Sequence, residues 1–124
     1  MVVRFTTRRE DFPPNLERLK IEHLVLHFSR DTGPAFEVPV RHLRFSEVGS
    51  GGAIGGAATS IDGTISTRRG NAGSWTGILG KAPLGTWELA LQDDPDVRRL
   101  FKDERIKDIL LVVTYRATLP PWPA

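Results

Sequence analysis

The sequence contains no cysteine, one methionine and one tyrosine among its 124 residues. Without cysteine the chain can form neither a disulfide scaffold nor a thiolate nucleophile, and zinc or iron–sulfur sites built on cysteine are excluded as well. The sequence also lacks any run of about 18 apolar residues, which is the length that a membrane-spanning helix requires. We therefore expect no membrane span.

Charge of either sign is nearly balanced, because Lys and Arg total 17 against 15 Asp and Glu. The paired arginines lie far apart in the chain, at Arg8–Arg9, Arg68–Arg69 and Arg98–Arg99. A surface that binds nucleic acid needs a larger basic excess gathered on one face. The charge pattern therefore argues against nucleic acid as a partner.

The first residues, Met1 to Arg4, do not follow the charged-then-apolar pattern of a secretory signal. A protein without cysteine is also compatible with a reducing compartment. We expect the chain to be cytoplasmic as synthesised.

Glycine and proline are frequent, at 12 and 9 residues, and they divide the chain into short segments separated by turns. A length of 124 residues with 40% hydrophobic residues is enough for one packed core without covalent cross-links. We expect one all-β domain spanning 1–124, an antiparallel β-sandwich of about seven or eight short strands with one short helix.

Alternation of apolar side chains places the strands. Ile21–Phe28 alternates in this way, and we expect it to form a β-hairpin with Phe36–Val40. Ile106–Tyr115 is rich in β-branched residues and apolar on both faces, which predicts a central strand. Further strands are expected at Val2–Thr7, Thr64–Thr67, Ser74–Leu79 and Thr86–Leu91.

Three local signals lie between these strands. Asp94 followed by Pro95 predicts the start of a short helix, because aspartate caps helix N-termini and proline suits the first helical position. Asp62-Gly63 predicts a tight turn. The small-residue stretch Gly49–Ala58 fits either a mobile loop or a tightly packed crossing.

Motifs for phosphate or metal binding are incomplete. Gly49 and Gly51 match the start of a dinucleotide-binding loop, but Ile54 occupies the third glycine position and no helix follows. His23 and His27 share one face of a strand, roughly 13 Å apart, too far to bind one ion together. We expect no metal and no cofactor.

Motifs for hydrolysis are also incomplete. The acids around Asp94 lie at the predicted helix start, where they satisfy free backbone N–H groups. A strained Gly-x-Ser-x-Gly turn, which presents a serine nucleophile, does not occur. We therefore predict no catalytic residues and a protein that is not an enzyme.

The segment from Arg68 to Trp75 is the strongest candidate for binding, because arginine and tryptophan dominate the energetics of interfaces. In the competing interpretation Trp75 packs in the core and the arginines are only solvated. The candidate interaction surface comprises Arg68, Arg69, Asn71, Trp75 and Trp122.

The chain resembles the C-terminal region of large bacterial TcA-like proteins, the A components of insecticidal Tc toxin complexes and their neuraminidase-like relatives. The resemblance covers roughly Phe5 to Pro123. The segments that carry it are Asp11–Leu16, Ile21–Leu26, Gly55–Gly63, Ile65–Trp75, Gly85–Leu91, Phe101–Leu110 and Val112–Tyr115.

In that family the region is a β-sandwich that docks the cocoon of the B and C components onto the pore of the A component. The resemblance therefore implies a non-catalytic assembly module, released as part of a toxin complex. TcA-like proteins are far longer than 124 residues, so the chain is either free-standing or an excised piece. Its partner is then a component of a toxin or of a bacterial injection particle, and a second copy of the chain stays open as a partner.

A carbohydrate-binding sandwich of the lectin type is the alternative. That function needs flat aromatic side chains facing solvent, and it therefore predicts exposure of Trp75, Trp87 or Trp122. The sequence leaves both functions open.

Overall fold

A computed structural model describes residues 2–30, 37–50, 52–102 and 106–120. The elements are β1 (Val2–Thr7), η1 (Arg9–Asp11), β2 (Glu17–Arg30), β3 (Pro39–Glu47), β4 (Ile54–Thr59), β5 (Thr64–Ser66), η2 (Gly73–Ile78), β6 (Gly85–Leu91), α1 (Pro95–Lys102) and β7 (Ile106–Thr118). Here η marks a 3₁₀-helix. Most of the described chain is therefore extended, as the sequence predicts.

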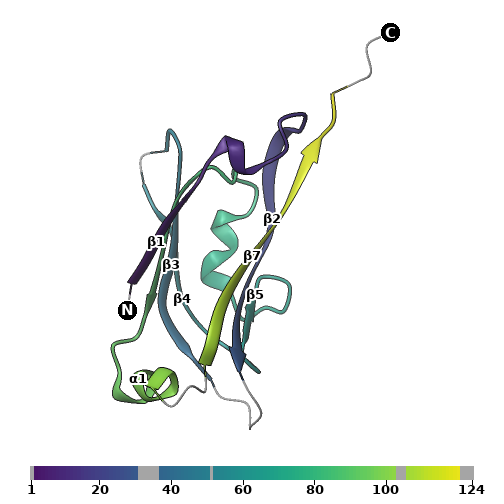
Figure 1. Ribbon diagram of the computed structural model, residues 1–124. Helices are drawn as coiled ribbons and strands as arrows, with labels where there is room; N and C mark the ends of the chain where they lie inside the picture. Colours follow the sequence, from purple (N-terminus) through teal and green to yellow (C-terminus); the bar gives the residue numbers. More distant parts are fainter. Residues whose placement is uncertain (1, 31–36, 51, 103–105, 121–124) are drawn as a thin grey trace.

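The strands form two antiparallel sheets that face each other (Figure 1). One sheet has four strands in the order β1-β6-β3-β4, and the other has three in the order β5-β2-β7. The inward-facing side chains of both sheets make one buried hydrophobic cluster. The predicted all-β antiparallel sandwich with one short α-helix is confirmed.

The core lies between the two sheets and receives large side chains from both. On β2 the alternating residues Leu24, Leu26 and Phe28 are fully buried, because every second side chain of a strand points to the same face. The opposing sheet contributes Phe45 and Trp87, whose ring centroids lie 4.2 Å apart. Large apolar side chains from both sheets therefore meet at the centre of the sandwich.

The predicted hairpin between Ile21–Phe28 and the following strand is wrong. β2 pairs with β5 and β7, whereas β3 pairs with β4 and β6 in the other sheet. Both strands bury alternate side chains in the same core, and they do so from opposite sides of it. The predicted start of the second strand, Phe36, lies outside the described residues.

The assignment of Ile106–Tyr115 to a central strand is also wrong for the single chain. Within the described residues β7 pairs only with β2 and lies at the edge of the three-stranded sheet, while β2 is its central strand. One apolar face of β7 packs on the core. The other faces solvent, and Leu110 and Val112 are exposed there.

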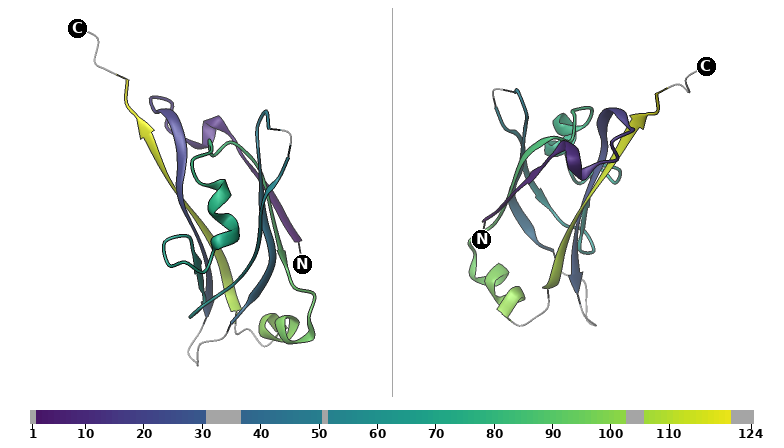
Figure 2. Two further views of the ribbon diagram at one scale, coloured as in Figure 1. Left: turned by 180° about the vertical axis from the view of Figure 1, so that it is seen from behind. Right: turned by 45° about the horizontal axis from the view of Figure 1, so that its top comes forward.

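The predicted strand Ser74–Leu79 is the 3₁₀-helix η2 instead. The Trp75 N–H donates to the Ala72 carbonyl at 3.0 Å, and the Leu79 N–H donates to the Thr76 carbonyl at 3.2 Å. These local bonds use the backbone groups that a strand would offer to neighbours. Figure 2 shows η2 in the gap between the two sheets, on the side away from β1.

The small-residue stretch Gly49–Ala58 resolves into a turn followed by β4. Gly55 has a φ of 144°, and a Cβ built on it would lie 1.8 Å from the Leu43 carbonyl oxygen on β3. Glycine therefore lets β4 approach its neighbour closely, and the second interpretation, a tightly packed crossing, holds.

Two local predictions are confirmed. Asp62 and Gly63 have φ values of 51° and 77° and connect the bridged pair Ile61 and Thr64 in a tight turn. Asp94 caps α1, because its Oδ1 accepts the Asp96 N–H at 2.8 Å.

Gly55→Ala tests the close approach of β4. We expect it to lower the free energy of unfolding by about 3 kcal/mol, because the added Cβ meets backbone atoms at a φ that alanine rarely adopts. Gly52→Ala is the matched control, since a Cβ there meets nothing within 4 Å. Urea denaturation measures both variants, and equal midpoints would contradict the close packing.

Candidate functional site

The segment Arg68–Trp75, the strongest candidate from sequence, connects β5 to η2. Its tryptophan is not available to a partner. Trp75 is fully buried, and its indole N–H donates to the Gly56 carbonyl on β4 at 2.9 Å. The expectation that Trp75 forms part of an exposed surface is therefore corrected: its large ring fills the core, and its polar edge is satisfied by β4.

Asn71 also has a structural role. Its side-chain amide donates to the Thr59 and Thr64 carbonyls at 3.2 and 2.9 Å, and its Oδ1 accepts the Ser66 N–H at 2.9 Å. These bonds tie the end of β4 to β5. Asn71 therefore stabilises the fold. Its side-chain amide is already hydrogen-bonded within the chain and is not available to a partner.

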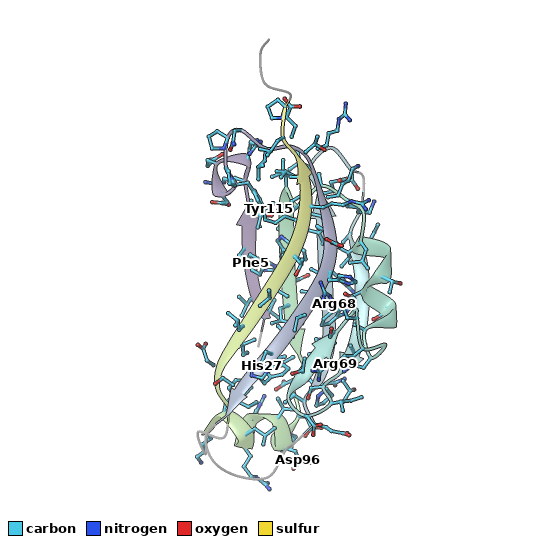
Figure 3. All side chains as sticks on the ribbon, turned by 90° about the vertical axis from the view of Figure 1, so that its right-hand side faces the viewer. Phe5, His27, Arg68, Arg69, Asp96 and Tyr115 are labelled. Atoms are coloured by element: carbon cyan, nitrogen blue, oxygen red, sulfur yellow. The ribbon has the colours of Figure 1, made fainter. Side chains whose placement is uncertain are left out.

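The two arginines of the segment are exposed. Figure 3 shows Arg68 and Arg69 beside β5, next to the face of the three-stranded sheet that turns away from the core. The Arg68 backbone N–H donates to Ser66 Oγ at 3.1 Å, which holds the turn. Of the predicted surface these two side chains are free to bind, and Trp122 lies outside the described residues.

The second buried tryptophan anchors β1. Trp87 on β6 is fully buried, its indole N–H donates to Thr7 Oγ1 at 3.0 Å, and its ring stacks at 6.0 Å on Phe5. Neither Trp75 nor Trp87 faces solvent, so neither offers the flat platform that the lectin alternative predicts.

η2 fills one side of the sandwich, which we call the closed side: the β4 and β5 edges with η2 between them. Beyond the bond from Trp75 to β4, the Gly80 N–H donates to the Ile21 carbonyl on β2 at 2.7 Å. The Ile21 N–H in turn donates to the Lys81 carbonyl at 2.8 Å. The Trp75 side chain thus links η2 to β4, and backbone bonds of the residues after η2 link it to β2.

The opposite side, bounded by the edges of β1 and β7, has no such bridge among the described residues, and we call it the open side (Figure 1). Large apolar side chains are exposed along both strands. Their exposed fractions are 43% for Val3 and 38% for Phe5 on β1, and 55% for Leu110 and 41% for Val112 on β7.

Register explains the exposure on β1. Val3 lies beside Leu89 and Phe5 beside Trp87, and both of these β6 residues are buried in the core. Neighbours in register point to the same face of a sheet, so Val3 and Phe5 point inward. They remain exposed because β1 is the edge strand of its sheet.

The upper end of the open side is covered by the segment between β1 and β2. Phe12 follows η1, and its ring meets Tyr115 of β7 edge-to-face with centroids 5.0 Å apart. The exposed apolar side chains of β7, Leu110 and Val112, precede Tyr115 along the strand.

His23 and His27 lie on the face of the three-stranded sheet that turns away from the core. Nδ1 of His23 is 3.2 Å from Thr67 Oγ1, and Nδ1 of His27 is 3.1 Å from Thr64 Oγ1. Threonine hydroxyls on the β5 side therefore orient both rings. The described residues hold no cluster of three metal-ligating side chains.

Three shallow hollows lie on the described surface. The hollow between the start of β1 and α1 measures about 450 Å³ and is lined by one carboxylate, Asp93, which pairs with Arg98. Two hollows near η1, of about 570 and 420 Å³, are lined by Glu17 and by Glu10. Two acids facing each other, as glycoside hydrolysis requires, do not line any of the three.

Glu88 on β6 is the centre of an ion-pair cluster on the outer face of the four-stranded sheet. Its Oε1 lies 2.9 Å from Arg4 Nη2, and its Oε2 lies 3.4 Å from His42 Nε2. Burial raises the pKa of Glu88, but the hydrogen bond and charge of Arg4, together with those of His42, outweigh it. The pKa therefore lies below its ordinary value of 4.5.

The open side was missed by sequence reasoning because its residues carry the same apolar signal as the core. Val3, Phe5, Leu110 and Val112 differ from buried residues only in what lies opposite them.

Asn71→Ala tests whether Asn71 has a structural role in the Arg68–Trp75 segment. We expect it to lower the free energy of unfolding by about 2 kcal/mol, because three hydrogen bonds of about 1 kcal/mol or less each are lost. Arg69→Ala is the control, with an expected change within about 0.5 kcal/mol. Chemical denaturation measures the free energy of unfolding of both variants. An unchanged value for Asn71→Ala would contradict the structural role of Asn71.

Glu88→Gln tests the ion-pair cluster through pH. Because the folded pKa lies below the unfolded one, the carboxylate stabilises the fold above about pH 4.5, and this contribution is lost as pH falls through the folded value. We expect a lower Tm for Glu88→Gln at pH 7 and no difference from wild type once Glu88 is protonated. A difference that does not change with pH would contradict the cluster. Arg4→Gln should move the loss to higher pH.

Within the described residues no helix is long and apolar enough to cross a bilayer. No family model, no curated protein and no solved structure matches the chain. The function is therefore inferred from the surface that the fold leaves uncovered, the open side.

Proposed function

We propose that this domain is a non-catalytic protein-interaction module that helps to assemble a larger complex. The observation that carries the proposal is the exposure of Val3, Phe5, Leu110 and Val112 along two free strand edges. Exposed apolar side chains along unpaired strand edges are typical of interaction sites. The resemblance to the C-terminal region of TcA-like proteins supports the same role, with a toxin or injection-particle component as partner.

A partner that adds an extended strand satisfies both features of the open side. Backbone groups at a free edge supply affinity, and alternating apolar side chains supply specificity. β1 is the edge strand of the four-stranded sheet, and its inward-facing Val3 and Phe5 are exposed. An extended strand added beside β1 would continue that sheet and contact these two side chains.

A phage-displayed library of random peptides tests the open side without knowledge of the natural partner. We expect selection on the purified domain to enrich peptides with alternating apolar residues. Val3→Lys should weaken a selected peptide by about tenfold or more, because one buried apolar side chain contributes roughly 1.5–3 kcal/mol. Fluorescence polarisation with the synthetic peptide measures the Kd.

Val48→Lys is the matched control, because Val48 is also exposed but lies in the turn between β3 and β4. It should bind the peptide as wild type does. If no alternating peptides are enriched, or if Val3→Lys binds as well as Val48→Lys, the open side is not the working surface.

A further inference from the structure

We propose that a second copy of this chain occupies the free edge of β7. Two β7 strands pair antiparallel about a twofold axis at Val112, and the two three-stranded sheets become one continuous sheet. The inference rests on the proposed function, because it names the partner for one of the two edges of the open side.

The bonding direction of β2 shows which of its backbone groups face β7. The Phe28 N–H donates to the Gly63 carbonyl at 2.8 Å, and the Thr67 N–H donates to the Leu24 carbonyl at 3.0 Å. Phe28 and Leu24 therefore bond toward the β5 side. Successive residues of a strand bond to opposite sides, so the odd-numbered residues between them bond toward β7.

The same alternation identifies the free groups of β7. Val25 and His27 of β2 lie opposite Val112 and Leu110 of β7. These even-numbered residues of β7 thus bond to β2, and the odd-numbered ones, such as Leu111, direct their N–H and C=O groups to the free edge. A neighbouring strand can pair with them directly.

One free group is already satisfied within the chain. The Ile109 N–H is bonded at 2.9 Å by the Asp108 carboxylate of its own strand. A charge placed on an edge in this way discourages indiscriminate strand addition. The edge therefore admits a partner whose charges fit, and Arg116 of a second copy is such a charge.

The outer face of β7 is complementary to itself. Its exposed face carries Asp108, Leu110, Val112, Thr114 and Arg116 in alternation. An antiparallel pairing centred on Val112 places Asp108 opposite Arg116 of the second copy. The twofold axis generates the same ion pair a second time, between Arg116 of the first copy and Asp108 of the second. Opposite charges facing each other across strands are stabilising, and like charges are not.

The inner face gains cover as well. The second copy would place its Leu111 and Val113 beside those of the first, on the face that looks toward β1. Leu111 and Val113 are only partly buried against the core in the single chain. The pairing thus adds apolar contacts on both faces of β7.

Single-cysteine variants test the pairing and its register together, because the chain has no native cysteine. At a twofold axis through a non-hydrogen-bonded pair, the two Val112 Cα atoms lie about 4.5 Å apart, within the roughly 4.4–6.8 Å range of disulfides. We expect Val112→Cys to form a disulfide-linked dimer under mild oxidation, measured by non-reducing electrophoresis and mass spectrometry. Unmodified protein should show twice the 13.8 kDa of one chain by light scattering.

Two controls define the register. Leu110→Cys should not cross-link to itself, because its copies lie four residues apart along the pair, roughly 14 Å. It should cross-link when mixed with Thr114→Cys. Val48→Cys, exposed in a distant turn, measures random collision. Cross-linking of Val112→Cys no faster than Val48→Cys would overturn the proposal.

Charge reversal provides a second, independent readout. Asp108→Arg and Arg116→Asp each place like charges across the axis twice, and each should weaken the dimer by about tenfold. The double variant Asp108→Arg/Arg116→Asp should restore wild-type dimerisation. Analytical ultracentrifugation measures the three Kd values, and a double variant weaker than both single ones would contradict the register.

The outcomes separate this inference from the proposed function. If the domain is monomeric and Val3→Lys still weakens peptide binding, the proposed interaction module stands and the pairing of two β7 strands is overturned. If the domain forms a dimer with the predicted cross-links but binds no selected peptide, the pairing of two β7 strands stands and the proposed interaction module is overturned.

Discussion

The burial of Trp75 against β4 determines which side of this sandwich is sealed. Its indole bond to the Gly56 carbonyl holds η2 between the sheets, and the backbone exchange between Ile21 and the Gly80-Lys81 segment completes the bridge to β2. Asn71 fixes the connection from β5 into η2. A large ring, one amide and a few backbone bonds thus replace a strand on the closed side. Nothing equivalent joins β1 to β7 in the described part of the chain.

This asymmetry leaves apolar side chains exposed along the two strand edges of the open side. On the closed side the unpaired backbone groups of the sheet edges meet η2 and its flanking residues. On the open side they meet solvent, together with Val3, Phe5, Leu110 and Val112. Strand edges of this kind are normally guarded against unwanted pairing, and Asp108 does so on β7. The open side therefore combines the attraction and the selectivity that a specific interface needs.

Local sequence patterns predicted where strands and the helix form better than they predicted which strands pair with each other. The alternation in Ile21–Phe28 and Thr86–Leu91, and the Asp94-Pro95 helix start, reflect forces that act over a few residues. Alternation says that one face of a strand is buried, but it does not say in which sheet, so the hairpin was misassigned. The two interpretations of Trp75 stayed open for the same reason, because arginine, glycine and tryptophan are typical of a binding loop until the core that receives the ring is known.

The segment Ile106–Tyr115 is the most informative of these differences. Its residues predict a strand covered on both faces and paired on both edges, whereas β7 in the single chain is paired on one edge. An apolar outer face on a free edge costs solubility and gains nothing for the folded monomer. The proposed pairing accounts for both observations, since a second β7 would make this strand central and cover its outer edge. On that proposal, the apolar pattern of Ile106–Tyr115 reflects a strand that is paired on both edges in the dimer.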